Sequence, residues 1–363
     1  MKKVLIVFNH PAPYKVRLFN ELSKYCDLHV SFERDKNKDR SASFYNENLF
    51  DFKTIKINGL KLGKENIVSC GVKNHIKNNK YDLIIMNGYS QFAEIKAIRY
   101  MQKHSVPYVL FINGGIIKDK ECSCKRKLKS KLISNASMYL SPDEESNKYL
   151  VYYGAGKEKI FNYPYSTIYK NEILAKPISD KEKQVIRNKY GLEGKRVFVS
   201  AGQLIKRKNY ELLINSWKDM PSDHHLYIFG DGKERHKYEK IIAENELNNV
   251  HLQGFLPRNE LLKVFSISDM FLFPSSEDIY GHVINEALSQ GLPVISNYNV
   301  NSAKALIDKS NGALTKDFSA KNILSLTDSV LKQYSFNDCV KTAHQNTIEI
   351  NSQVIAKHLG LDK

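Results

Sequence analysis

Short apolar runs alternate with longer amphipathic stretches along the chain. The apolar runs have the length of buried strands, and they lie at 4–8, 28–32, 82–86, 108–112 and 138–140, and again at 196–201, 225–229, 250–254, 270–274 and 293–296. Apolar residues with helical spacing separate them at 14–24, 92–104, 125–134, 208–218, 234–246, 258–267 and 281–290. A strand followed by a helix, repeated in this way, predicts an α/β protein whose parallel sheets are covered by helices on both faces.

The chain has 363 residues, which favours two domains because a domain holds roughly 150 residues. Segment 164–195 carries Pro164 and Pro177 and changes from apolar to charged, so we expect the linker there. The two domains are therefore expected at 1–165 and 170–335. The tail at 337–359 has the pattern of one or two helices.

Several features indicate a cytoplasmic protein. No apolar run reaches the ~18 residues that a membrane span needs. The first ten residues, MKKVLIVFNH, imitate a signal peptide, but their apolar run is short and no small-residue cleavage site follows. The five cysteines are an odd and scattered set, which favours free thiols in a reducing compartment. Cys122 and Cys124 form a lone C-x-C, for which incidental thiols are favoured over a metal site.

The formal charge of +16 is distributed unevenly. Residues 1–170 hold 30 Lys and Arg against 16 Asp and Glu, a net charge of +14, whereas residues 171–363 hold 25 against 23, a net charge of +2. A basic first half predicts an anionic partner, which leaves nucleic acid, acidic lipid and a phosphate-bearing substrate as alternatives.

Two strand-to-helix turns in the second half have the composition of ligand-binding loops. In AGQLIKRKNYELLI (201–214), Gly202 permits a tight turn, and three cations follow at Lys206, Arg207 and Lys208. Cations at the carboxyl end of a strand suit a diphosphate, and a solvated basic turn is an equally good interpretation of this segment alone. In YIFGDGKER (227–235), Gly230 allows a backbone to approach a ligand closely, although most G-x-G turns are only tight loops.

The most informative segment is PSSEDIYGHVINEALSQGLPVIS (274–296). Glu277 and Asp278 lie on the loop after an expected strand, and Gly281 is expected to open a helix that Gly291 closes. The apolar face of that helix is expected at 283, 284, 287 and 288, and the polar face at 282, 285, 286 and 289. Backbone amides at 281–283 would be free at the helix start and would favour an anion, with Glu286 one turn further on.

These residues resemble glycosyltransferase family 4, retaining enzymes with the GT-B fold. The resemblance rests on GQLIKRK, FGDG, LQGFLP and EDIYGHVINEALSQGLPVI, and it covers about 196–315. It implies two Rossmann-like domains that face each other across a cleft, the first binding the acceptor and the second the nucleotide-sugar donor. It also implies that a helix at about 340–358 packs back on the first domain.

The resemblance assigns roles to the donor residues. Asp278 matches the first acid of an E-x7-E motif, which lies against the donor sugar, and Glu286 matches the second, which holds the ribose hydroxyls. Lys208 matches the lysine that grips the diphosphate. The amides of Gly281, His282 and Val283 match those at the phosphate.

The chain departs from the family pattern in two places. The first motif acid is normally Glu, and here Glu277 precedes Asp278, so either carboxylate remains a candidate for the sugar contact and for catalysis. The arginine that usually follows the loop glycine is Gln203, so Arg207 or Lys206 is expected to compensate. The chain shows no D-x-D pair, and we expect transfer without a metal or other cofactor.

Two loops of the first half are candidates for the acceptor or the cleft. NHPAPYKVRLFNELSK (9–24) offers Tyr14, Lys15 and Arg17 where the first strand meets the first helix. Asn113, Gly114 and Gly115 follow another expected strand. Many relatives carry a histidine near there, which this chain lacks, and the glycines alone also fit a simple turn.

The stretch KDKECSCKRKLKSKLISNA (118–136) combines seven cations with an apolar stripe at 128, 132 and 133. A basic amphipathic helix suits an anionic membrane surface, where each cation contributes roughly 1 kcal/mol. A solvated helix face and a nucleic-acid patch are the alternatives, and the second lacks interleaved aromatic residues for base stacking. The expected membrane-facing cations are Lys125, Arg126, Lys127, Lys129 and Lys131.

Together these features predict a retaining glycosyltransferase that uses a nucleotide sugar, with a UDP-sugar favoured. The expected acceptor is a saccharide carried by a lipid, and the expected location is the inner face of the cell membrane, in bacterial surface polysaccharide synthesis. We expect no nucleic-acid partner. The alternatives are a nucleotide-sugar epimerase of the same fold and, in another class, a basic nucleic-acid-binding protein.

Overall fold

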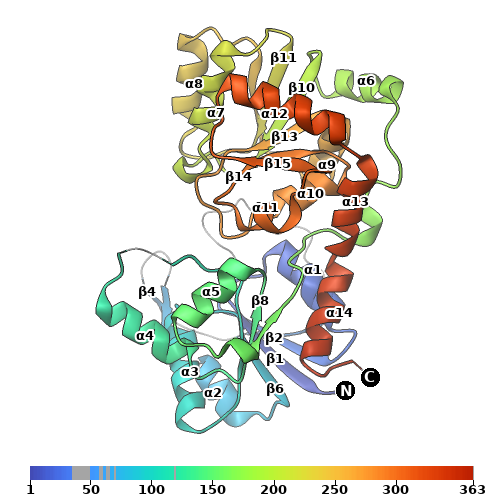
Figure 1. Ribbon diagram of the computed structural model, residues 1–363. Helices are drawn as coiled ribbons and strands as arrows, with labels where there is room; N and C mark the ends of the chain where they lie inside the picture. Colours follow the sequence, from blue (N-terminus) through green and yellow to red (C-terminus); the bar gives the residue numbers. More distant parts are fainter. Residues whose placement is uncertain (35–49, 57–59, 63–65, 69–70, 118–119, 363) are drawn as a thin grey trace. The chain divides into compact units, whose positions relative to one another are not determined.

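The computed structural model describes residues 1–34, 50–56, 60–62, 66–68, 71–117 and 120–362 (Figure 1). The chain forms two compact units, 1–167 with 348–363, and 168–347. The chain therefore passes between the units twice, once on each side of residues 168–347. Cys70 and Lys118, which belong to the expected thiols and to the basic stretch, lie outside the described residues.

Unit 1 is built on a parallel sheet in the order β3-β2-β1-β6-β7-β8-β9. Its strands are β1 (Lys3–Phe8), β2 (Asp27–Phe32), β3 (Lys53–Lys56), β6 (Leu83–Met86), β7 (Val109–Phe111), β8 (Met138–Ser141) and β9 (Ile160–Asn162). A separate antiparallel pair joins β4 (Leu60–Leu62) to β5 (Asn66–Val68). The helices are α1 (Pro13–Leu22), α2 (Gly71–Asn78), α3 (Phe92–Lys103), α4 (Ser123–Ile133), α5 (Glu144–Tyr152) and α14 (Ile348–His358).

Unit 2 is built on a parallel sheet in the order β12-β11-β10-β13-β14-β15. Its strands are β10 (Arg196–Ala201), β11 (His224–Phe229), β12 (Val250–Gly254), β13 (Met270–Phe273), β14 (Val294–Asn297) and β15 (Gly312–Thr315). The helices are α6 (Asp180–Lys189), α7 (Tyr210–Ser216), α8 (Arg235–Glu244), α9 (Arg258–Ile267), α10 (Val283–Ser289), α11 (Asn301–Leu306), α12 (Ala320–Gln333) and α13 (Phe336–Gln345).

Each sheet lies between helices because alternate strand residues enter different cores. In β10, Val197 and Val199 pack with α9, α10 and α13, whereas Phe198 packs on the opposite face with α7 and α12 (Figure 1). Buried parallel strands of this kind appear in a sequence as continuous apolar runs. The expected α/β class with parallel sheets and helices on both faces is confirmed.

In both units the strand order reverses direction once. The chain winds from β1 outward to β2 and β3 and then returns to place β6 on the other side of β1. In unit 2 it winds from β10 to β11 and β12 and returns to place β13 beside β10. Loops at the carboxyl ends of two such strands diverge and leave a crevice, which is where open α/β sheets bind ligands. The carboxyl ends of the β1/β6 and β10/β13 pairs are therefore the expected positions of ligand sites.

The segment expected to be a linker contains a helix. α6 begins after Ser179, whose hydroxyl accepts from the backbone of Glu182 while the Glu182 carboxylate accepts from the Ser179 amide. This capping box satisfies amides that would otherwise lack partners at the helix start. The proline-rich composition of 164–178 concealed this signal.

Candidate donor site

An ion-pair cluster occupies the β10/β13 switch point of unit 2. Lys208 follows β10 in a short 3-10 turn at 206–208, and Asp278 follows β13. The Lys208 Nζ atom lies 2.5 Å from Asp278 Oδ2, and Arg207 Nη1 lies 3.1 Å from the same oxygen. Glu277 is exposed, and only its carbonyl oxygen is recorded in contact with Arg207. Of the two candidate carboxylates, Asp278 is therefore the one held among the loop cations.

The electrostatics of the cluster favour the charged form of Asp278. Burial raises the pKa of Asp278, but the positive charges of Lys208 and Arg207 outweigh burial and hold that pKa below its ordinary value. Lys208 is only 8% exposed, and its ammonium also lies 4.4 Å from the centre of the Phe273 ring. An anion that enters here meets two cations already gathered at one point.

Hydrogen bonds to one main-chain carbonyl hold the loop after β10 against the loop after β13. The Arg207 carbonyl oxygen accepts hydrogen bonds from the Ser276 amide at 2.9 Å and from the Ser275 hydroxyl at 3.1 Å. A cavity of about 440 Å³ opens beside the loops, and its lining includes Lys206, Arg207 and Ser276. Lys206 is exposed there, so all three loop cations border either the cluster or this cavity.

The loop glycines are required by close approach of one backbone to another. A Cβ atom on Gly230 would lie 2.0 Å from the Gly202 carbonyl oxygen, and Gly230 has φ +135°. Gly202 itself has φ +151°, and its amide donates to Phe229 O at 2.9 Å. Glycine at positions 202 and 230 therefore allows the loops after β10 and β11 to pack closely against each other. This packing accounts for both glycines without a bound ligand. Gln203 lies in the same half-buried loop.

The helix of the second motif begins later than expected. α10 starts at Val283 with His282 at its N-cap, while Gly281 lies before it with φ +92° and packs against Val300. The expected polar face is also partly wrong. Asn285 and Ser289 are fully buried, and the Asn285 amide donates to Asn346 O at 2.8 Å, so they anchor α10 instead of facing a ligand.

Glu286 is the acid of α10 that remains near the surface, and it has a partner that the sequence did not indicate. Arg258, the first residue of α9, places Nε 3.4 Å from Glu286 Oε1 and Nη1 2.5 Å from Glu172 Oε1. Glu172 belongs to the segment that enters unit 2. The LQGFLP motif, which ends just before Arg258, indicated the loop before α9. No local pattern in the sequence indicates that Arg258 contacts Glu172 and Glu286, which lie far from it along the chain.

In unit 1, the expected cleft residue Lys15 is fully buried. Its Nζ atom lies 4.2 Å from the ring centre of Phe111, 4.6 Å from that of Tyr165 and 5.9 Å from that of Phe8. No hydrogen bond to this atom is recorded among the described residues, and burial lowers the pKa of Lys15 well below its ordinary value. Lys15 therefore belongs to an aromatic cluster, and its expected exposure to a cleft is wrong. Lys15 lies on the face of α1 that packs against the core of unit 1.

The other candidates of unit 1 lie at the carboxyl edge of its sheet. Tyr14 and Arg17 are half-buried on α1. The Asn113 amide donates to Asn87 Oδ1 at 3.1 Å, which links the ends of β6 and β7. A Cβ on Gly115 would lie 2.4 Å from the Tyr149 ring, and Gly114 has φ +135°. Packing and backbone shape therefore account for both glycines.

The apolar stripe of α4 faces inward. Leu132 and Ile133 are buried in the core of unit 1, so the stripe cannot enter a membrane. Lys129 pairs with Glu121 at 2.7 Å and donates to Tyr153 Oη at 3.2 Å, so this half-buried cation already has an acidic partner. The Arg126 guanidinium stacks 4.4 Å from the Tyr152 ring centre. The exposed lysines of α4 are Lys125, Lys127 and Lys131.

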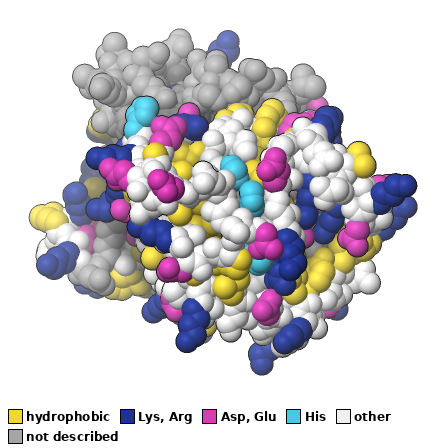
Figure 2. Space-filling model, turned by 90° about the horizontal axis from the view of Figure 1, so that it is seen from above, with side chains coloured by type: hydrophobic (Ala, Val, Ile, Leu, Met, Phe, Trp, Pro, Cys, Tyr) yellow, Lys and Arg dark blue, Asp and Glu magenta, His cyan; other side chains and the backbone are white. Residues whose placement is uncertain are grey.

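On unit 2, several charged side chains form pairs. Lys237 lies 2.5 Å from Glu211, Arg235 lies 2.7 Å from Glu239, and the Lys240 and Glu244 side chains approach to 3.6 Å. Figure 2 shows one face of the molecule, on which basic and acidic side chains are interspersed. This mixture matches the near-neutral charge of the second half of the sequence.

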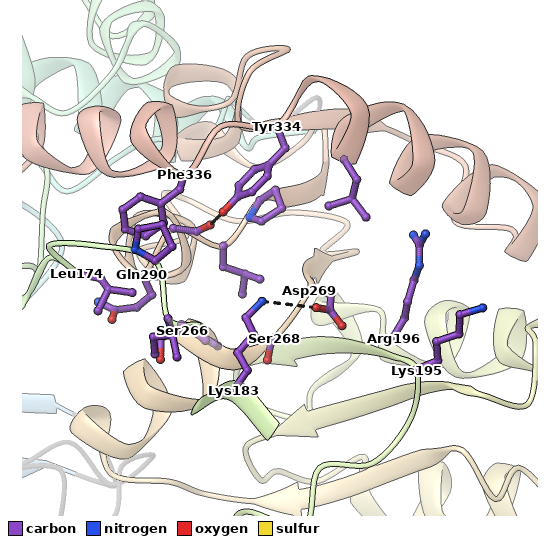
Figure 3. Close-up of a pocket in the computed structure, with 17 residues that line it drawn as sticks. Leu174, Lys183, Lys195, Arg196, Ser266, Ser268, Asp269, Gln290, Tyr334 and Phe336 are labelled. Atoms are coloured by element: carbon purple, nitrogen blue, oxygen red, sulfur yellow. Dashed lines mark hydrogen bonds and ion pairs between the residues drawn. The ribbon is translucent and has the colours of Figure 1, made fainter. Parts of the chain in front are cut away.

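A second cavity of unit 2, of about 280 Å³, lies at the opposite edge of the sheet (Figure 3). Its lining includes Arg196, which begins β10, Asp269, which precedes β13, and Pro293, which precedes β14. Lys183 reaches across it to within 3.7 Å of Asp269. Because these residues lie at the amino ends of the strands, this cavity is separate from the ion-pair cluster.

Two kinds of feature are absent from the described residues. No group of three or more His, Cys, Asp or Glu side chains there has the arrangement of a metal site. No helix in that part of the chain is both long and apolar enough to span a membrane.

Comparison with known proteins shows what these residues are similar to. Residues 182–347 match the family model of glycosyl transferases group 1. Alpha-galactosylglucosyldiacylglycerol synthase of Streptococcus pneumoniae is 26% identical over 151 residues, which cover 40% of each chain. Lipopolysaccharide glucosyltransferase WaaG of Escherichia coli is 24% identical over 157 residues, which cover 42% of this chain and 41% of WaaG. The chain thus aligns with less than half the length of these relatives.

Solved structures extend the likeness to the whole chain. Anabaena HepE, crystallised in complex with UDP, superposes with a TM-score of 0.81 over 99% of both chains at 16% identity. This similarity shows the fold, which is the GT-B arrangement of two parallel-sheet units. The ion-pair cluster, Glu286 and Arg258 all lie within the residues that match the family model. Residues 182–347, somewhat less than half of the chain, are thus similar to the glycosyl transferases of group 1.

Proposed function

We propose that the protein is a retaining glycosyltransferase that transfers a sugar from a UDP-sugar to a saccharide carried by a lipid. The observation that carries this proposal is the cluster of Lys208, Arg207 and Asp278 at the β10/β13 switch point. The similarity of 182–347 to a glycosyl transferase family supports the reaction class. The complexes of HepE with UDP and with UDP-glucose support the nucleotide.

Each part of the cluster has a role in this proposal. Lys208 and Arg207 hold the donor diphosphate, with Lys206 at the edge of the adjoining cavity. Gly281, His282 and Val283 precede or begin α10, where their amides approach the phosphates. Glu286 holds the ribose hydroxyls. Arg207 supplies the charge that Gln203, in place of the usual arginine, cannot.

In the proposed step, the bond between the anomeric carbon and the diphosphate oxygen breaks, and UDP leaves with the electron pair. The acceptor hydroxyl oxygen bonds to the anomeric carbon on the same face, and its proton passes to the departing phosphate oxygen. Lys208 and Arg207 stabilise the negative charge that develops on the diphosphate. Asp278 holds both cations at that position before the donor binds and lies where a positive charge on the sugar is stabilised. The cations and amides supply the electrostatic stabilisation, so we propose that no metal is required.

We place the acceptor on unit 1 and the protein on the inner face of the cell membrane. Lys125, Lys127 and Lys131 form an exposed basic row on α4, which suits anionic lipid by charge alone. Two relatives, by their names, act on a glycolipid and on lipopolysaccharide. Synthesis of a bacterial surface polysaccharide fits these observations, with Tyr14, Arg17 and Asn113 as candidate contacts to the acceptor.

A thermal-shift panel with UDP-, GDP-, ADP- and TDP-sugars tests the donor site. We expect UDP-sugars to raise the melting temperature, because a ligand that binds only the folded state stabilises it. A saccharide acceptor should then yield a longer product and free UDP. Release of an epimer without an acceptor would favour the epimerase alternative. RNA binding without any nucleotide-sugar response would refute the proposal.

A further inference from the structure

One guanidinium group links the proposed ribose acid to the segment that enters unit 2. Arg258 Nη1 lies 2.5 Å from Glu172 Oε1, and Arg258 Nε lies 3.4 Å from Glu286 Oε1. The three side chains are 26%, 21% and 15% exposed respectively, so water screens these pairs only in part. Two carboxylates from distant parts of the sequence therefore share one cation.

The Glu172 side of this arrangement is firmly anchored. Glu172 Oε2 accepts a hydrogen bond from the Tyr169 amide at 2.7 Å, and its carbonyl oxygen accepts one from Gln290 Nε2 at 2.8 Å. The short contact to Arg258 uses the other carboxylate oxygen. Glu172 therefore holds the guanidinium in one place, where its positive charge forms an ion pair with Glu286 that includes no hydrogen bond from Nε.

This geometry matters because a glutamate side chain has several freely rotating bonds. A carboxylate that must accept hydrogen bonds from two neighbouring hydroxyls loses affinity if it samples other positions. The contact with Arg258 is an ion pair that includes no hydrogen bond from Nε, so that nitrogen takes up no acceptor site of the carboxylate. Arg258 can therefore attract the Glu286 carboxylate toward one position by charge.

We propose that Arg258, anchored by Glu172, is a positioning residue that orients Glu286 toward the ribose hydroxyls of the donor nucleotide. This inference rests on the proposed function. It assigns the recognition of the ribose to three residues from the entering segment, α9 and α10, instead of to Glu286 alone. Lysine cannot replace Arg258, because a compact ammonium on a flexible stem cannot donate to Glu172 and hold positive charge at a fixed position beside Glu286 as the rigid, delocalised guanidinium does.

The test compares UDP with 2′,3′-dideoxy-UDP, which lacks both hydroxyls. Calorimetry gives the two dissociation constants for wild type and for Arg258→Ala, Arg258→Lys, Glu172→Gln and Glu286→Ala. We expect wild type to prefer UDP by about tenfold or more, since hydrogen bonds to a charged group are the strong ones. Glu286→Ala should remove this preference. Both Arg258 variants should lose most of it by weakening UDP and leaving the dideoxy compound unchanged, and Glu172→Gln should reduce it less.

Two controls separate positioning from general damage. Arg196 pairs with Asp328 at 3.2 Å and begins β10, at the end of that strand opposite to the donor site. Arg196→Ala should therefore leave the preference for UDP unchanged. In the double variant Arg258→Ala/Glu286→Ala, the loss of preference should equal that of Glu286→Ala alone. Melting curves confirm that each variant is folded, and Arg258→Lys keeps the charge if Arg258→Ala does not fold.

The outcomes distinguish this inference from the proposed function. If Glu286→Ala loses the preference while the folded Arg258 variants keep it, the positioning role is wrong and the donor site stands. If wild type binds the two nucleotides equally, the ribose role of Glu286 is wrong as well. If wild type binds no nucleotide, the proposed function itself fails.

Discussion

Replacement of Lys208 by alanine gives the most direct test of the diphosphate site. A charge-assisted hydrogen bond is worth about 1.5–3 kcal/mol. If Lys208 makes one to the departing diphosphate, its loss should lower turnover by about 10- to 150-fold. The matched control is Lys206→Ala, because Lys206 is exposed and has no ion pair recorded in the described structure. We expect the control to lose much less.

The structure also predicts a cost in stability for this substitution. Asp278 is 12% exposed and loses its closer partner in Lys208→Ala. Breaking a buried ion pair typically costs about 3–5 kcal/mol, and the remaining contact with Arg207 should reduce that figure here. The double variant Lys208→Ala/Asp278→Asn also removes the carboxylate charge that has lost its closer partner, and it should recover part of the loss in melting temperature.

The assay measures initial rates of UDP release at saturating donor, together with melting curves for each variant. A folded Lys208→Ala protein with full turnover would refute the diphosphate site. In that case the loop would be a basic turn whose lysine serves only to pair with Asp278. A loss of melting temperature with unchanged turnover would lead to the same conclusion.

Three further predictions follow from the contacts. Asp278→Asn should lower turnover more than Glu277→Gln, because only Asp278 lies among the cations, and the reverse order in rate assays would exchange their roles. Lys15→Met should stabilise the protein by about 1–4 kcal/mol at pH 7, as apolar replacements of buried ionic groups often do. Because burial lowers the pKa of Lys15, the unfolded chain binds the extra proton at pH values between that lowered pKa and about 10.5, and wild-type stability rises with pH across this window. The gain in denaturant titrations should therefore shrink as pH approaches 10.5, and a gain that does not change with pH would contradict the explanation. Replacing the three exposed lysines of α4 by glutamine should weaken the free energy of binding to anionic vesicles, measured by co-sedimentation, by about 3 kcal/mol. If Lys129→Gln weakened binding as much as the triple variant, the basic surface that we assign to α4 would be wrong.

Much of the fold could be predicted from the sequence because buried parallel strands are written as continuous apolar runs. The runs at 4–8 and 196–201 correspond to β1 and β10 within one residue at each end. Strands with weaker patterns could not be found in this way. β3 (KTIK) is mostly exposed. β9 and β15 lie at sheet edges, where β9 has no buried residue and β15 is buried only at its two ends.

The candidate site was partly predictable because a motif fixes local geometry. The cations at 206–208 and the acids at 277 and 278 follow adjacent strands, so the fold brings them together once the strand order is known. The side-chain contacts decide between the two acids, since Asp278 rather than Glu277 reaches Lys208. Arg258 could not be predicted, because its partners lie 86 residues before it in Glu172 and on α10 in Glu286.

The basic first half illustrates a physical limit on sequence arguments. Each lysine counts equally toward the net charge of +16, but the folded contacts give each a different effect. Lys15 lies in an aromatic cluster and presents no charge to a partner, and Lys129 is neutralised by Glu121. Only cations such as Lys125, which remain exposed, attract an anionic surface, since the attraction depends on charge that solvent can reach. A basic stretch therefore gives an upper limit on basic surface, and the contacts decide how much of it is available for binding.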